Sequence, residues 1–366
     1  MKILLKIREI SLKYNIRLLA IIVSRIVLAV MLEFWKICTS ALLMVLLIFW
    51  FQGGFLASLV LVVAVFGIFY NAQDLLLYHP NQPPQSRLYV ELPSIVNLPY
   101  ENHFIKSQDG TVINMVLIPQ KKADSPTLIF FHGNAGNIGN RLLNAYGLYT
   151  ACGFNILMVE YRGYGKSQGS PSEHGFYIDS QTAMDFLLKR PEINKSRIIV
   201  FGRSLGGGVA THLLTQPYYS RFICALILEN TFTSIQSIGA VIFKMDFLKY
   251  VPSIMLKNKF CSNKRMSNIR QPTLFISGLS DNLIPPKMMQ ELFQLSASSF
   301  KRFVPIQGGN HNDTWTCPGY YEAIASFSRE VSHIIYMEIP PSHTIVLPVI
   351  ASGTENNFSK ITSIVE

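Results

Sequence analysis

Charged residues are scarce in this chain of 366 residues: they make up 15% of it, against 49% for hydrophobic residues. A typical soluble domain contains about 25% charged residues, so this chain is more apolar than such a domain. The deficit is greatest in residues 37–71, where no residue is charged. Because about 20 apolar residues suffice to cross a bilayer, we expect one transmembrane helix within residues 37–72. The run is too long for a cleaved signal peptide, and no small-residue cleavage site follows it.

Cysteine motifs are also missing. The five cysteines include no Cys-x-x-Cys pair and no Cys/His spacing of the kind that holds a metal. We therefore expect neither a metal nor a cofactor. The sequence leaves open whether Cys261 pairs with Cys317.

A basic stripe interleaved with aromatic residues is absent too, although the net charge is +10. Residues 1–36 hold seven Lys or Arg against two Glu, so +5 of the charge belongs to this segment and +5 is spread over the rest of the chain. This distribution argues against nucleic acid as a partner. The expected partners are a bilayer and a lipid-like substrate or other acyl ester or thioester.

What the chain does contain divides it into five parts. They are a basic segment (1–36), a membrane anchor (37–72), a proline-containing linker (73–99), an α/β domain (100–336) and a tail rich in Pro, Ser and Thr that we expect to be disordered (337–366).

The α/β domain begins with a hairpin pattern around Asp109-Gly110, after which short apolar runs alternate with helical stretches. Continuous apolar strands separated by helices predict a mostly parallel sheet with helices on both faces. Residues 231–270 interrupt the alternation and are rich in Phe, Met, Ile and Lys, so we interpret them as a short helical lid. The expected parallel strands are 127–131, 155–160, 197–201, 224–229, 273–276 and 302–306.

One expected strand ends in Gly202-Arg203-Ser204-Leu205-Gly206 and leads directly into a helical stretch. A serine between two glycines at such a turn is typical of a nucleophile elbow. The glycines allow the strand and helix backbones to pass close together, which exposes the Ser204 hydroxyl at the end of the sheet. Ser204 is therefore the predicted nucleophile.

A serine nucleophile needs a base, and the base needs an acid that holds its tautomer. His311 is the histidine that directly follows a late strand, and Asp281 lies on a loop between Ser204 and His311. We predict these two as base and acid. Glu229, at the end of the preceding strand, is the rival acid, whereas Asp313 is too near His311 in sequence to orient it easily.

An oxyanion hole needs two backbone N–H groups. One should come from Leu205, directly after the nucleophile. We assign the other to Asn134, in the Gly-rich loop 132–137. A phosphate-binding loop is disfavoured, because no Lys-Ser/Thr follows these glycines.

Five motifs together resemble the α/β-hydrolase superfamily, and more closely its membrane-bound α/β-hydrolase domain-containing proteins. They are His-Gly-Asn-Ala-Gly-Asn (132–137), Tyr-Arg-Gly-Tyr-Gly-Lys-Ser (161–167), Gly-Arg-Ser-Leu-Gly-Gly (202–207), Ser-Gly-Leu-Ser-Asp-Asn-Leu-Ile-Pro-Pro (277–286) and His-Asn-Asp-Thr-Trp (311–315).

The resemblance implies an α/β-hydrolase fold with an eight-stranded sheet, and a triad of Ser204, Asp281 and His311. Some members of the wider group remove palmitate from proteins, so it also implies acyl thioesters as possible substrates. Glu160 stands where this group would have Asp, outside the triad.

The sequence thus predicts a membrane-anchored serine hydrolase that cleaves ester or thioester bonds of an amphiphilic acyl substrate. Two alternatives stay open. One is a palmitoyl-protein thioesterase facing the cytosol, and the other is a non-catalytic domain of the same fold that serves as an interaction module.

Charge around the anchor predicts its orientation. Seven of the nine charges before residue 37 are positive, so the positive-inside rule places the N-terminus in the cytosol and the domain in the lumen or outside the cell, as a single-pass type II protein. In the rival arrangement, the apolar run 18–32 inserts as well despite Arg25, and the domain returns to the cytosol. A lumenal domain would open three sequons to glycosylation, at Asn194, Asn312 and Asn357.

Overall fold

The structure is a computed structural model that describes residues 23–25, 27, 28 and 32–338. Most of the basic segment and of the apolar run 18–32 lies outside the described residues. So does the predicted tail from residue 339 onward, together with the sequon at Asn357.

Eight strands form one sheet with the order β1-β2-β4-β3-β5-β6-β7-β8. The first two strands form an antiparallel hairpin, and β2 also pairs antiparallel with β4, whereas all other neighbours are parallel. The predicted mostly parallel, eight-stranded sheet is confirmed. The strands are β1 (Glu101–Lys106), β2 (Val112–Ile118), β3 (Thr127–Phe131), β4 (Asn155–Val159), β5 (Ile198–Arg203), β6 (Ile223–Glu229), β7 (Thr273–Gly278) and β8 (Lys301–Ile306).

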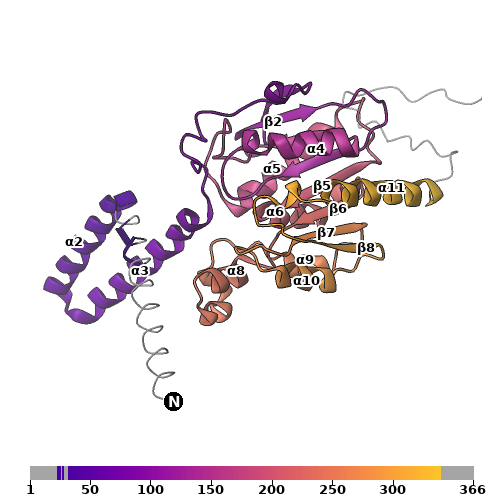
Figure 1. Cartoon of the computed structure of the whole chain (residues 1–366). Coiled ribbons are helices and arrows are strands. Elements are labelled where there is room, and N and C mark those ends of the chain that lie inside the picture. The colour runs from indigo at the N-terminus through magenta and orange to yellow at the C-terminus, as the bar shows by residue number, and fades with distance from the viewer. Residues whose placement is uncertain (1–22, 26, 29–31, 339–366) are drawn as a thin grey trace, which may run out of the picture.

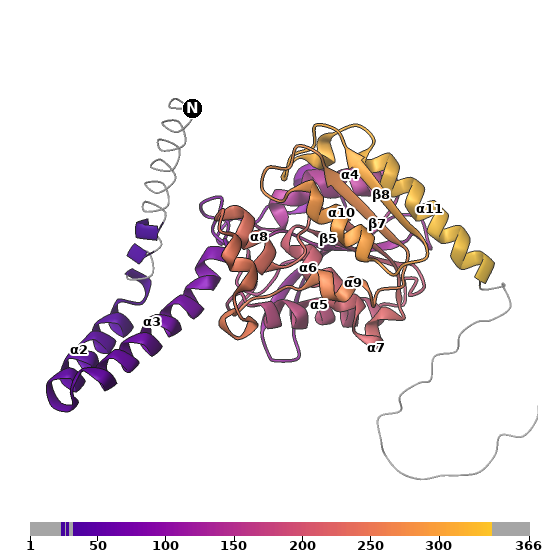
Figure 2. The same cartoon turned by 90° about the horizontal axis from the view of Figure 1, so that it is seen from below.

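Helices cover both faces of the sheet because its central strands are apolar on both sides. Along β3, Ile129 and Phe131 belong to one buried cluster and Leu128 and Phe130 to the other, as the period of two in a strand requires. Figures 1 and 2 show the two helical layers. One face packs against α5 (Glu173–Leu188), α6 (Leu205–Leu214), α9 (Ser262–Met266) and α10 (Pro286–Leu295), and the other against α4 (Leu142–Cys152) and α11 (Tyr320–Glu338).

The predicted lid is a helical segment that leaves the sheet after β6 and returns at β7. It consists of α8 (Ile235–Ile242), η3 (Asp246–Tyr250), η4 (Ser253–Met255) and α9. Gln236 holds its turns together, since its side-chain amide donates to the carbonyls of Leu248 and Val251 at 2.9 and 2.8 Å. The remaining short elements of the domain are η1 (Pro93–Val96), η2 (Ile138–Arg141), α7 (Pro217–Ser220) and η5 (Thr314–Thr316).

The apolar run near the N-terminus forms two helices instead of the single helix expected for residues 37–72. They are α2 (Trp35–Gln52) and α3 (Gly54–Leu77), with 18 and 24 residues. Gly53 separates them with φ +82°, a backbone conformation that is readily available only to glycine. Both helices are long and apolar enough to be candidate membrane spans. Figures 1 and 2 show them side by side, outside the α/β domain.

The predicted linker, residues 73–99, begins inside α3, which extends to Leu77, and its remainder contacts the α/β domain. Tyr78 is buried, and its hydroxyl donates to the Asn258 side chain at 2.7 Å. The next residue, His79, donates its backbone N–H to the Asn134 carbonyl at 2.9 Å. This segment therefore joins α3 to the α/β domain through buried contacts.

Candidate active site

Ser204 stands between β5 and α6 in a strained conformation, with φ 53° and ψ −119°. The crowding of three backbones around it explains the strain. A Cβ atom at Gly202 would lie 2.5 Å from the Gly206 carbonyl oxygen, and one at Gly206 would lie 2.1 Å from the Phe131 carbonyl oxygen. Such strain costs about 1–3 kcal/mol and persists where the surrounding structure enforces it. The local geometry is that of the predicted elbow.

The three residues predicted as nucleophile, base and acid form one hydrogen-bonded chain. His311 lies with Nε2 3.1 Å from Ser204 Oγ and Nδ1 2.8 Å from Asp281 Oδ2. The other Asp281 oxygen accepts hydrogen bonds from the backbone N–H groups of Leu283 and Ile284, at 2.9 and 2.8 Å. Asp281 is almost fully buried and His311 is partly so. The arrangement can draw a proton from Ser204 while Asp281 fixes the imidazole.

Glu229, the rival acid, does not contact His311 and instead contacts Arg203 and Tyr320. Its side chain is fully buried, with Oε1 3.5 Å from Arg203 Nε, and Oε2 accepts a hydrogen bond from the Tyr320 hydroxyl at 2.6 Å. Arg203 in turn donates to the backbone carbonyl of His311 at 2.6 Å and to Asn312 Oδ1 at 3.2 Å. Burial, followed by the negative charge of Glu229, raises the pKa of Tyr320 well above its usual value, so this hydroxyl stays a donor.

This chain of contacts makes Arg203 and Glu229 positioning residues for the loop that carries His311. Sequence reasoning considered Glu229 only as a rival acid and missed Arg203, because Arg203 occupies a variable position of the serine motif and its partners lie far along the chain. Two features of the sequence could have indicated this positioning role: Arg203 directly precedes Ser204, and Glu229 is the last residue of its strand.

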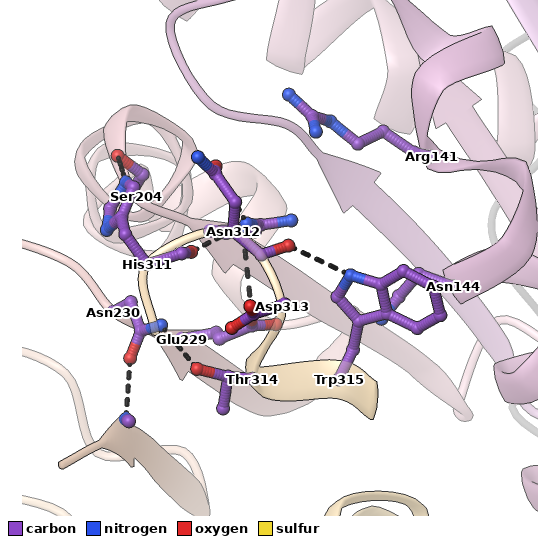
Figure 3. A network of polar contacts seen from close by, with 12 residues as sticks. Arg141, Asn144, Ser204, Glu229, Asn230, His311, Asn312, Asp313, Thr314 and Trp315 are labelled. Atoms are coloured by element: carbon purple, nitrogen blue, oxygen red, sulfur yellow. Dashed lines mark hydrogen bonds and ion pairs between the residues drawn. The ribbon is translucent and has the colours of Figure 1, made fainter. Parts of the chain in front are cut away.

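A second set of contacts fixes the same loop from below. The Asn230 side chain donates to Thr314 Oγ1 at 2.9 Å and accepts from the Gly278 N–H at 2.8 Å. Figure 3 shows Asn230 and Thr314 joined beneath the loop, with His311 beside Ser204. Asp313 does not reach the imidazole, since it accepts hydrogen bonds from Asn310. The base is therefore held by groups from β6, β7 and the elbow itself.

The two segments that carry the predicted oxyanion donors lie next to Ser204. Leu205 begins α6, and the loop with Asn134 lies so near that a Cβ atom at Gly133 would be 3.4 Å from Ser204 Cβ. The Asn134 carbonyl accepts hydrogen bonds from the Tyr164 hydroxyl and from His79 N–H, at 2.7 and 2.9 Å. These bonds fix the position of the Asn134 carbonyl within the loop.

Buried polar side chains support this loop from within. His132 and Glu160 are fully buried, with Nε2 and Oε1 3.2 Å apart, and the other Glu160 oxygen accepts from the Ile138 N–H at 3.1 Å. Arg141 donates to the Ala135 carbonyl at 2.9 Å, and burial followed by the positive charge of Arg203 lowers the pKa of Arg141 to about 10. Glu160, where an Asp was expected, therefore reaches far enough to hold the oxyanion loop.

Among the residues that the structure describes, no three His, Cys, Asp or Glu side chains gather in a way that could hold a metal ion. All five cysteines have free thiols, so Cys261 and Cys317 are unpaired here. Burial raises the pKa of the Cys152 and Cys224 thiols to about 12, which suits packing and not nucleophilic chemistry.

Two of the three sequons lie within the described chain, and both asparagines are engaged. Asn194 hydrogen-bonds Asp124 and accepts from the Ser196 hydroxyl at 2.7 Å. Asn312 is exposed, but its side-chain oxygen accepts from Arg203, and Thr314 of the same sequon is fully buried.

Comparison with known proteins shows to which family the chain belongs. A family model described as "alpha/beta hydrolase fold" matches residues 126–254. Protein bem46 of Schizosaccharomyces pombe is 40% identical over 283 residues, which is 75% of this chain and 92% of that protein. The alpha/beta hydrolase domain-containing protein WAV2 of Arabidopsis thaliana is 36% identical, covering 75% of this chain and 90% of its own. This chain belongs to the α/β-hydrolase family.

One further relative is named as a membrane protein, and one solved structure shares the fold. An uncharacterized membrane protein of Saccharomyces cerevisiae, YNL320W, is 33% identical over 78% of this chain and 97% of its own. Among solved structures, the Pyrococcus furiosus esterase Pf2001 superposes with a TM-score of 0.55 at 19% identity, over 67% of this chain and 95% of the esterase. At that identity the esterase shows the shared fold alone. The predicted α/β-hydrolase fold is confirmed.

The crowding at the elbow predicts a specific loss of stability. Gly202→Ala should lower the free energy of unfolding by about 1–3 kcal/mol, because its Cβ would meet the backbone of α6. Gly239→Ala is the matched control: no atom lies within 4 Å of its Cβ, and alanine in helix α8 should gain up to about 1 kcal/mol. Thermal unfolding of the detergent-solubilised variants measures both. Equal melting temperatures for the two variants would contradict the crowding argument.

Proposed function

We propose that this α/β-hydrolase is a membrane-anchored serine hydrolase with Ser204 as nucleophile, His311 as general base and Asp281 as the acid that orients it. The observation that carries the proposal is the unbroken hydrogen-bond chain from Ser204 Oγ through His311 to Asp281, at 3.1 and 2.8 Å. A fold used only as an interaction module would have no need to keep this chain and the strained serine. The geometry therefore favours catalysis over the non-catalytic alternative.

The proposed mechanism follows from these positions. Ser204 Oγ attacks the acyl carbonyl while His311 Nε2 takes its proton, and Asp281 stabilises the imidazolium that forms. The backbone N–H groups of Asn134 and Leu205 bind the oxyanion of the tetrahedral intermediate. His311 then returns the proton to the leaving alcohol or thiol, which leaves an acyl-enzyme. A water activated by His311 releases the acid and restores the serine.

An amphiphilic acyl ester or thioester is the proposed substrate class. The support comes from two features that a hydrolase of small soluble esters does not need: candidate membrane spans next to the domain, and a helical lid with exposed apolar side chains. A palmitoyl-protein thioesterase is the narrower candidate, and it requires a cytosolic active site.

The orientation of the domain depends on how many helices cross the bilayer. We propose that α3 alone crosses, as in the type II arrangement, because its uncharged part, residues 54–73, has 20 residues, whereas the uncharged part of α2, residues 37–52, has only 16. One observation favours a second arrangement. The break at Gly53 lays α2 beside α3, and if both crossed, the basic N-terminal segment and the domain would share the cytosolic side.

Replacement of the proposed nucleophile gives the most direct test. Ser204→Ala should abolish both ester hydrolysis and labelling by a fluorophosphonate probe, because the probe reacts with the activated hydroxyl. The fold should persist, and circular dichroism of the variant serves as control. Labelling that survives in Ser204→Ala would reject Ser204.

The assignment of the acid is tested by a matched pair. Asp281→Asn should lower kcat by about a thousandfold or more, because the amide favours the wrong imidazole tautomer. Glu229→Gln should cost far less, since its carboxylate contacts Arg203 and not His311. Hydrolysis rates on one soluble short-chain ester measure both variants. An active Asp281→Asn beside an inactive Glu229→Gln would reverse the two roles.

Topology is tested by protease protection on intact microsomes. In the proposed arrangement the domain is lumenal and should resist protease until detergent is added. Microsomes treated with both detergent and protease serve as the control, because digestion of the domain there shows that the protease is active. Digestion of the domain without detergent would establish the two-crossing arrangement and strengthen the cytosolic thioesterase candidate.

If the domain is lumenal, the sequons predict an uneven glycan pattern. Asn312 should carry little glycan in the active enzyme, because its side chain accepts from Arg203 beside His311. Asn194 lies far from the triad in the turn before β5 and serves as internal comparison. Mass spectrometry of the active enzyme measures occupancy, and a fully glycosylated Asn312 with unchanged activity would contradict the prediction.

A further inference from the structure

The lid carries an exposed apolar surface that the catalytic chemistry does not use. Its members lie between α8 and the end of η4, and Tyr250 and Ile254 are 83% and 80% exposed. We call this surface the lid face. It consists of Ile242, Phe247, Tyr250, Ile254 and Met255.

The lid face is joined directly to α3 by side-chain contacts. Gln73 donates to the Met255 carbonyl and accepts from the Lys257 N–H, both at 2.9 Å. Asp74 binds Lys257 Nζ at 2.5 Å and accepts from the Asn258 amide at 2.6 Å. Figures 1 and 2 both show α8 next to the end of α3 that enters the domain. The lid and the anchor are therefore held in one arrangement.

The position of these contacts along α3 sets the height of the lid face above the bilayer. The apolar run ends at Tyr70, before the polar Asn71, and Asp74 follows four residues after Tyr70, which is about 6 Å along a helix axis. The headgroup layer on each side of a bilayer is about 5–7 Å thick. Met255 and its neighbours consequently lie at the level of the headgroups when α3 spans the membrane.

The charge of the segment suits such a surface. Residues 242–259 contain four lysines and one acidic residue, Asp246. Exposed apolar side chains flanked by lysines are typical of segments that lie in the interface of a bilayer containing anionic lipids.

We infer that the lid face rests on the bilayer in which the chain is anchored, so that an acyl chain leaves the membrane next to the lid. The inference relies on the membrane anchoring proposed above. The lid face therefore contacts the lipid surface itself. When α3 spans the bilayer, the hydrogen bonds that join its Gln73 to Met255 and Lys257 hold the lid face next to that surface. The lid thereby binds the membrane on one side and borders the catalytic domain on the other.

Photocrosslinking of the full chain in proteoliposomes of phosphatidylcholine with a minority of phosphatidylserine tests the contact itself. A photoreactive benzoylphenylalanine at position 254 should crosslink to lipid. The same group at position 218 should not, although Tyr218 is also 54% exposed, because it lies on α7 at the far end of the domain from α3 (Figure 2). Absent crosslinks at position 254, or equal ones at both positions, would overturn the inference.

A kinetic comparison tests the consequence. The double variant Tyr250→Asp, Ile254→Asp should lower kcat/KM for a long-chain ester embedded in the vesicles by about tenfold relative to a water-soluble short-chain ester, since it removes two apolar interface contacts. Tyr218→Asp should leave the ratio unchanged, and an unchanged ratio in the double variant would overturn the inference. A wild type that crosslinks at position 254 but hydrolyses neither ester would support the docking surface and reject the proposed hydrolase activity.

Discussion

The close approach of three backbone segments at the end of β5 is the constraint on which the rest of the site depends. The strand leaves at Gly202, α6 begins at Leu205, and the end of β3 presses against Gly206 through the Phe131 carbonyl. Because this space admits no Cβ atom, the chain can turn only with Ser204 in a strained conformation at the tip. The same contact fixes where β3 ends, and Asn134 follows three residues after Phe131. The same packing contact thus places both the proposed nucleophile and the loop proposed to bind the oxyanion.

The proposed base, His311, lacks such local enforcement, since it stands on a loop after the edge strand β8. Its support comes from the elbow. Arg203, directly before Ser204, hydrogen-bonds the His311 carbonyl, and the buried Glu229 and Tyr320 hold Arg203 in turn. A buried ion pair stabilises little by itself, because desolvation offsets its attraction. Its effect here is geometric: the residue beside the nucleophile sets the distance to the base.

Sequence patterns predicted those parts of the molecule that local physics determines. Apolar runs and the two glycines around Ser204 act over a few residues, so the strands and the elbow could be predicted, and chain order favoured Asp281 and His311 as partners. The break at Gly53 could not be foreseen, because a glycine in an apolar run is compatible with one helix or two. Nor could the role of Arg203, whose partners Glu229, His311 and Asn312 lie from 26 to 109 residues away. The prolines of residues 78–99 suggested a linker, but composition does not reveal that Tyr78 is buried.

The contacts of residues 74–79 give α3, the proposed membrane anchor, a direct connection to the loops of the proposed active site. Where α3 ends, the Leu77 carbonyl accepts a hydrogen bond from the Asn134 side chain at 3.0 Å, and His79 donates to the Asn134 carbonyl. One turn earlier, Asp74 holds the lid through Lys257 and Asn258. A flexible tether would let the domain tumble above the bilayer, whereas an anchor bound to both the oxyanion loop and the lid fixes the orientation of the active site relative to the helix. The anchor therefore acts as part of the site's framework, and removing it would take away hydrogen bonds from the loop that is to bind the oxyanion.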